Sequence, residues 1–142
     1  MVTSRRAAAV VIVTALSLLA GCGRSSPNRA TVYPVTGSVQ TKGKGIAHVW
    51  VTFLALDRQE GPGLETEVLT NPDGQFRATT YDTGDGLPPG HYAVFLIWPD
   101  VVTDDPALGG DKLRGRYNDR QKPAFTIEVK PEPNNIPSFD VK

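Results

Sequence analysis

The sequence predicts an all-β domain built as a sandwich of two sheets. Its 142 residues include 12 prolines and 14 glycines, and from residue 33 onward these interrupt the chain at short intervals. No window in that region has the spacing of a useful amphipathic helix, whereas several short runs alternate apolar and polar residues. A chain of this size is expected to form a single hydrophobic core.

Two strands are expected in the first third of the domain. Alternation over residues 35–40 predicts a first strand with a thin apolar face, and a turn over 42–45 follows it. The second strand, 48–56, carries apolar side chains on both faces, with Trp50 on one and Phe53 on the other. We therefore expect this strand to be central in its sheet or to have a covered outer face.

A tight turn, Asn71-Pro72-Asp73-Gly74, separates predicted strands over 65–70 and 75–80. Pro72 presets φ near about −65° at the first central position, and Gly74 accepts the positive φ that other residues resist. Apolar residues on either side give this turn the appearance of a β-hairpin.

Two further features predict the centre of the core and a candidate loop. The run 91–98 follows a proline-rich turn over 83–90 and is apolar on both faces, so we expect it to be the central core strand. The next 25 residues, 99–123, form the longest irregular stretch, and long loops in small domains are usually functional or disordered.

Strands over 125–130 and 136–141, separated by a turn at 131–135, complete the predicted domain. The first of the two has one polar face. The expected fold is thus a single seven-stranded antiparallel β-sandwich over residues 32–142.

The N-terminal residues predict export and a lipid anchor. The uncharged run 7–20 follows Arg5 and Arg6; with 14 residues it is too short to span a bilayer and right for a signal peptide. It ends in Leu19-Ala20-Gly21-Cys22, which resembles a bacterial lipoprotein signal with cleavage between Gly21 and Cys22. Thioether formation would consume the chain's single cysteine and explain the absence of a disulfide partner.

The lipoprotein resemblance implies a signal peptide over 1–21, a flexible tether over 22–31, and a permanent anchor of three acyl chains, palmitate among them, at Cys22. Gly23 stands where some lipoproteins carry the aspartate that retains them in the inner membrane. By that analogy we expect the outer membrane, with the domain facing the periplasm or the exterior.

Charge excludes nucleic acid as a partner. Cleavage would remove Arg5 and Arg6 and leave 13 basic against 15 acidic side chains, a net charge of −2. The nearest basic cluster, 112–122, is interleaved with Asp111 and Asp119, so it cannot present an unbroken positive stripe to phosphates.

Four segments in this order resemble the carboxypeptidase regulatory-like domain, as found in small lipoproteins of planctomycete bacteria: VTGSV at 35–39, VWVTF at 49–53, NPDGQF at 71–76 and LPPGHY at 87–92. The resemblance implies a transthyretin-like (prealbumin-like) sandwich that acts as a folding or interaction module. It implies no catalytic residues and no cofactor.

The residues themselves also argue against an enzyme. The only histidines, His48 and His91, lie at strand entrances, where surface or capping roles are common. The tail 138–142 lacks the Tyr-Arg-Gly-Ser type ending of transthyretin-like hydrolases. A hydrolase would need a pocket that joins a histidine to a nucleophile such as Ser38 or Thr80.

The loop residues and the aromatic residues suggest two binding chemistries. Aspartates gather in two loops, but without the alternating spacing of a calcium loop, so no metal ligands are assigned; the residues are Asp82, Asp85, Asp100, Asp104, Asp105 and Asp111. Aromatic side chains could instead form a platform for a sugar or a partner, although such residues are usually buried in the core. Trp50 belongs to this group, and the candidate binding surface is Trp98, Tyr117 and Tyr81.

The leading expectation is therefore a lipid-anchored envelope module with a non-catalytic structural role, or one in binding a protein or glycan through its long loop and sheet edges. A carbohydrate-binding or calcium-dependent adhesion module is the alternative, and a hydrolase is third.

Overall fold

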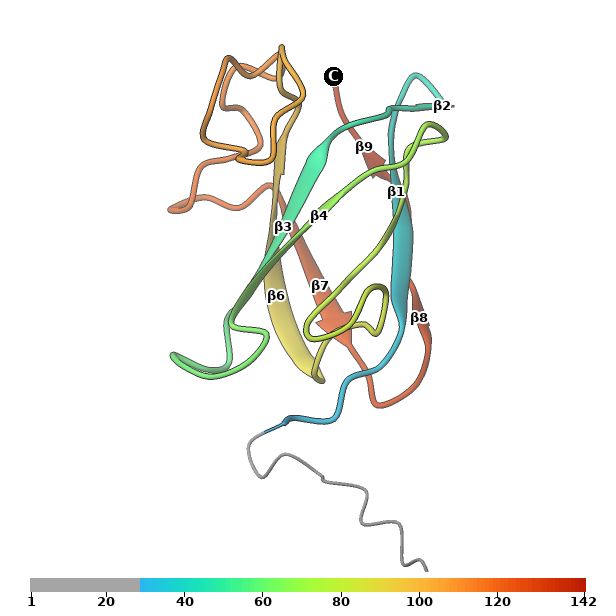
Figure 1. Cartoon of the computed structure of the whole chain (residues 1–142), viewed down its shortest axis with the longest axis vertical. Helices are drawn as coiled ribbons and strands as arrows, with labels where there is room; N and C mark the ends of the chain where they lie inside the picture. The colour runs from blue at the N-terminus through green and yellow to red at the C-terminus, as the bar shows by residue number, and fades with distance from the viewer. Residues whose placement is uncertain (1–28) are drawn as a thin grey trace, which may run out of the picture.

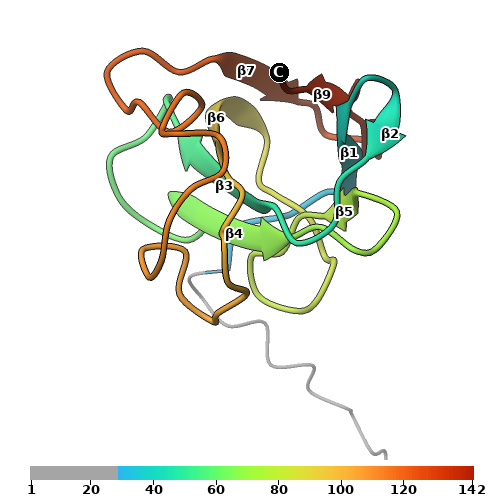
Figure 2. The same cartoon turned by 90° about the horizontal axis from the view of Figure 1, so that it is seen from above.

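The computed structural model describes residues 29–142, which form nine strands in two sheets and contain no helix. Figure 2 shows the two sheets facing each other as the layers of a sandwich. The predicted all-β, two-layer architecture is confirmed. The predicted signal peptide and most of the predicted tether, including Cys22, lie outside the described residues.

One layer is a four-stranded antiparallel sheet in the order β4-β3-β6-β7. Its strands are β3 (Trp50–Ala55), β4 (Glu65–Leu69), β6 (Gly90–Ile97) and β7 (Phe125–Val129). The strands β3 and β6 occupy the centre, as their two apolar faces predict, because each is covered on both sides.

The outer face of this sheet shows how that cover is made. Phe95 is only 1% exposed although it points away from the sandwich interior. The Arg120 guanidinium lies 5.6 Å from the centre of its ring and also pairs with Glu65 on the edge strand β4. The later part of the long loop, which carries Arg120, therefore shields the outer face of the sheet.

The second layer is built around β1 (Val35–Thr41). On one side β1 pairs antiparallel with β5 (Gln75–Arg77) and with β2 (Lys44–Gly45), and on the other it pairs parallel with β8 (Asn134–Asn135) and β9 (Phe139–Asp140). The central strand of this layer is thus hydrogen-bonded along both of its edges.

Aromatic rings join the two layers inside the core. Phe76 from β5 lies 5.7 Å from Phe53 of β3 and 5.9 Å from Phe139 of β9, measured between ring centres. Phe139 lies 4.8 Å from Phe125 of β7, which in turn stacks on Tyr117. This aromatic column (Phe53, Phe76, Phe139, Phe125, Tyr117) connects both sheets and the long loop.

The strand pattern differs from the sequence prediction in three respects. Nine strands replace the expected seven, three of them only two residues long, and the pairing is not wholly antiparallel because β8 and β9 run parallel to β1. Of the predicted last strand, 136–141, only β9 is a strand, while β8 lies within the predicted turn 131–135, and Pro137 stands between β8 and β9. A proline inside a short strand has no N–H for the ladder, so a break at this point follows from its chemistry.

The third difference concerns the turn at 71–74. Its local geometry is as predicted, with Gly74 at φ 77° and Asn71 Oδ1 accepting hydrogen bonds from the Asp73 and Gln75 amides. The strands on either side, however, belong to different sheets, so the turn is a crossover between layers and not a hairpin.

The two ends of the sandwich carry different segments (Figure 1). The chain emerges from the described N-terminus at the end where β1 and β6 begin, beside the loop over 78–89. The loop over 98–124 and the β1–β2 turn lie at the opposite end.

Candidate functional site

Tyr81, one of the three predicted binding aromatics, fastens the N-terminal segment. Its hydroxyl accepts a hydrogen bond of 2.7 Å from the Ala30 amide, and the Arg29 guanidinium lies 4.3 Å from the centre of its ring. Arg29 also forms an ion pair with Asp82. The last part of the predicted tether, residues 29–31, is therefore bound to the 78–89 loop at this end of the sandwich.

Trp98 and Tyr117 lie at the other end, and both are half-buried against the core. The Lys112 ammonium sits 4.9 Å from the Trp98 ring centre, while Tyr117 stacks on Phe125 and accepts a hydrogen bond from the Lys142 amide. The three predicted aromatics thus have separate packing partners and do not form one platform.

The long loop is closed at its base by its own backbone. Lys112 N donates to Trp98 O at 2.8 Å, and Asp100 N donates to Gly110 O at 3.0 Å. The Asp111 carboxylate accepts from the amides of Trp98, Leu113 and Gly115. Because these contacts fix both ends, residues 99–110 project as a defined lobe, and we call this segment the loop tip.

The loop tip exposes apolar side chains. Of the four large hydrophobic residues exposed in the described part of the chain, three lie here: Val101, Val102 and Leu108, each more than half exposed. The fourth, Leu56, belongs to the loop after β3. The tip also carries three aspartates and no basic residue, so it is an apolar surface with an acidic border.

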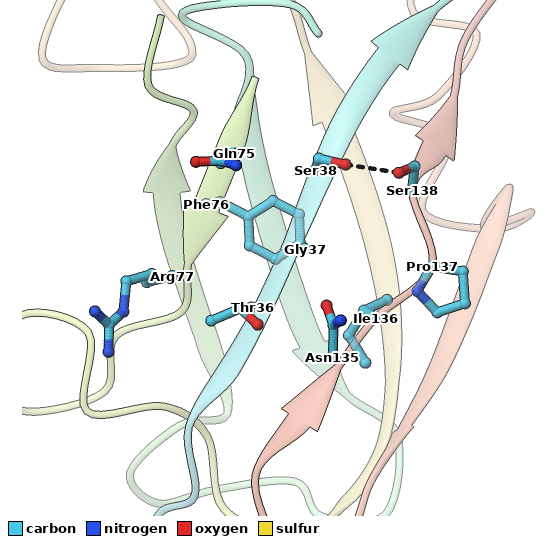
Figure 3. A pocket seen from close by; sticks show the side chains of 10 residues that line it. All are labelled: Thr36, Gly37, Ser38, Gln75, Phe76, Arg77, Asn135, Ile136, Pro137 and Ser138. Carbon is cyan, nitrogen blue, oxygen red and sulfur yellow. Dashed lines mark hydrogen bonds between the residues drawn. The ribbon is translucent and has the colours of Figure 1, made fainter. Parts of the chain in front are cut away.

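A second surface is a polar groove on the outer face of the β1 layer (Figure 3). It has a volume of about 500 Å³ and is lined from β5 on one side, from β1 in the middle and from residues 135–138 on the other. Six of its lining residues have hydroxyl, amide or guanidinium groups: Thr36, Ser38, Gln75, Arg77, Asn135 and Ser138.

A β-bulge accompanies this groove. Thr36 pairs with Asn135 and Val39 pairs with Phe139, so two residues of β1 oppose three residues of the C-terminal segment. A bulge bends the strand that carries the extra residue and redirects its side chains. Ser138 consequently reaches Ser38, with 2.7 Å between the two hydroxyl oxygens.

Among the described residues, neither Ser38 nor Thr80 has a histidine as a hydrogen-bond partner. Ser38 is engaged with Ser138, and the Thr80 hydroxyl donates to Gly86 O at 2.7 Å. Neither histidine lines the groove of Figure 3. His48 lies in a tight turn with φ 60°.

His91 instead pairs with Asp57 on the neighbouring loop. One oxygen of Asp57 accepts from both the backbone amide of His91, at 2.7 Å, and its ring nitrogen Nδ1, at 2.9 Å. The backbone and ring hydrogen bonds lower the pKa of Asp57, and the bond to Asp57 raises the pKa of His91. Since both groups are exposed, this is a surface ion pair that fixes a loop.

Several of the loop aspartates bind the backbone of their own loops. Burial raises the pKa of Asp85, but hydrogen bonds from the amides of Thr80, Asp82 and Tyr81 outweigh it, so the pKa lies below its usual value. Within residues 29–142, no three acidic, histidine or cysteine side chains are grouped as metal ligands.

Local sequence patterns predict the turns between the strands, but no pattern in the sequence is strong enough to predict the groove. The signal available was Pro137 within an expected strand, which marks a bulge or a break. What the sequence could not show is that this break faces Ser38 and Arg77, because β1 and β5 lie far away along the chain.

The fold and these surfaces define an all-β sandwich with two candidate contact faces and no assembled catalytic group among its described residues. No family model and no curated protein matches the chain. In the described part of the chain, no helix is long and apolar enough to cross a membrane.

Proposed function

We propose that this protein is a lipid-anchored module of the cell envelope that binds a protein partner through its loop tip and has no catalytic activity of its own. The observation that carries the binding role is the clustering of Val101, Val102 and Leu108 on a lobe whose base is fixed. Exposed apolar residues that gather on one lobe, and are not scattered singly, mark interaction sites.

The partner's chemistry follows from the loop tip. Full burial of an apolar side chain of this size is favourable by about 1.5–3 kcal/mol, and a partner that covers the exposed half of each of the three would gain part of that. Asp100, Asp104 and Asp105 border them, so the complementary surface is an apolar pocket with lysine or arginine on its rim. The same negative border disfavours an anionic lipid surface.

The position of the tip agrees with an anchor at Cys22. Residue 29 leaves the domain at the end opposite the loop tip (Figure 1). A domain attached to a membrane through residues preceding 29 would therefore present the tip away from that membrane, where an envelope protein can reach it.

The anchor is tested by intact-mass measurement of the protein purified from membranes of bacteria that express the full chain. We expect a species that begins at Cys22 with added acyl mass, and its loss in Cys22→Ala. An unmodified chain that begins elsewhere would contradict the anchor while leaving the loop-tip contact to be judged separately.

The contact is tested with a photo-crosslinking amino acid at position 102, and at position 56 as the matched control, since Leu56 is equally apolar and 53% exposed. We expect a discrete protein adduct from position 102 only. It should be lost in Leu108→Ser and weakened at higher salt and in Asp104→Asn, because the partner's rim is basic. Adducts that survive these changes, or that are identical from both positions, would contradict the proposal.

A further inference from the structure

The polar groove of the β1 layer has the size and the rigidity of a ligand site. About 500 Å³ lies in the range of small-molecule pockets. Its walls come from strands of one sheet, and the hydrogen bond between Ser38 and Ser138 joins two of them at 2.7 Å. A ligand here would meet two serine hydroxyls that are already fixed relative to each other, which lowers the ordering cost at that point of the groove.

Its charge is positive. Arg77 is the single charged residue among the described residues that line the groove, and no carboxylate accompanies it. Within residues 29–142 its guanidinium forms no salt bridge or hydrogen bond. The side chain lies along Gly84, where an added Cβ would come 3.3 Å from Arg77 Nε. The guanidinium is thus exposed at the margin of the groove, on the side of the 78–89 loop (Figure 3), where its planar donors can meet the carboxylate of a chain that extends along the groove to this edge.

The other groups are of a kind that recognises sugar hydroxyls. Thr36, Ser38 and Ser138 each combine a donor and an acceptor in one hydroxyl, and Gln75 and Asn135 add amide groups. Pro137 and the exposed part of Ile136 contribute apolar surface against which the C–H groups of a sugar ring can pack. The Phe76 ring is buried behind Gly37 and only closes the floor of the groove.

The pairing of β1 argues against an extended peptide. β1 is bonded to β5 on one side and to β8 and β9 on the other, so this strand offers no free backbone edge for strand addition. We infer that the groove binds a carboxylate-bearing sugar chain, with the uronate carboxylate on Arg77 and the hydroxyls on the serine, threonine and amide side chains. This site is separate from the loop tip.

The test is a titration of the full chain in detergent micelles with trigalacturonate, followed by amide chemical shifts. The neutral probe is its methyl ester, which keeps the hydroxyls and removes the charge. We expect shifts confined to the groove residues and binding that weakens about tenfold or more for the ester and for Arg77→Gln. The ester should bind wild type and Arg77→Gln equally.

Matched controls separate recognition from general charge attraction. Arg114→Gln removes the same charge from an exposed loop position and should leave affinity unchanged. Asn135→Ala should weaken the acid and the ester by the same factor. The proposal is overturned by shifts elsewhere on the domain, by equal affinity for acid and ester, by an equal loss in Arg114→Gln, or by tighter binding of an acidic tripeptide. None of these outcomes bears on the crosslink at position 102.

Discussion

The Asp57–His91 pair shows how a single exposed carboxylate can hold a loop to a strand. Asp57 Oδ2 binds both the amide and the ring of His91, and the ring also feels the charge of Glu128. The hydrogen bond to Asp57 and the charges of Asp57 and Glu128 raise the pKa of the histidine above its ordinary 6.5. The backbone and ring hydrogen bonds from His91 lower the pKa of the aspartate below its ordinary 3.8.

Asp57→Asn should therefore return the His91 pKa toward 6.5, as measured from the pH dependence of its ring proton shifts. In the wild type the histidine's contribution to stability is fully present below pH 6.5 and is lost as pH rises through its folded pKa. The aspartate's contribution is present above pH 3.8 and is lost as pH falls through its lower folded pKa. An unchanged His91 pKa in the variant would contradict this pairing.

At the scale of the elements, backbone hydrogen bonds attach the 78–89 loop to the start of the domain. Leu87 exchanges two hydrogen bonds with Tyr33, at 2.9 and 3.0 Å, which attach the start of the domain to this loop. Gly86 lies beside them with φ 106°, and a Cβ built on it would be 1.8 Å from Tyr33 O. Only a residue without a side chain permits this approach.

Gly86→Ala should lower the free energy of unfolding by about 3 kcal/mol, since both backbone strain and a steric clash oppose it. Gly43→Ala is the matched control, because Gly43 also has a positive φ, 76°, but has no atom within 4 Å of an added Cβ. That control should lose only about 1 kcal/mol. Urea unfolding measures both, and equal losses would mean that the contact with Tyr33 is unimportant.

At the scale of the whole molecule, the aromatic column couples the two sheets to the long loop. Phe139→Ala would remove the ring that contacts both Phe76 and Phe125, and we expect a loss of about 4 kcal/mol. Tyr117→Phe keeps the stacking and removes only the acceptor for the Lys142 amide, so about 1 kcal/mol is expected.

Both values come from urea unfolding monitored by tryptophan fluorescence and circular dichroism. The two signals should change together in each variant if the sheets unfold as one unit. Separate transitions in the wild type would show that the column does not couple the layers.

The sequence predicted what depends on neighbouring residues. Alternation and turn chemistry located the main strands, and the two apolar faces of 91–98 identified the central strand β6. These patterns do not predict which distant segments pair, because the alternation within a strand does not identify the strand that pairs with it. The 71–74 turn was therefore assigned to one sheet when it connects two, and the groove between Arg77 and Ser138 was not foreseen.

Because β1 pairs with the C-terminal strands β8 and β9, one of its edges can be completed only at the end of synthesis. Ser38 and Ser138 are 100 positions apart, and chains elongate at about 5–20 residues per second, so β1 waits about 5–20 s for its second neighbour. Throughout that interval one edge of the strand is open and the polar groove lacks a wall. A growing chain is thus vulnerable to mispairing at β1, and only a finished chain can hold a ligand there.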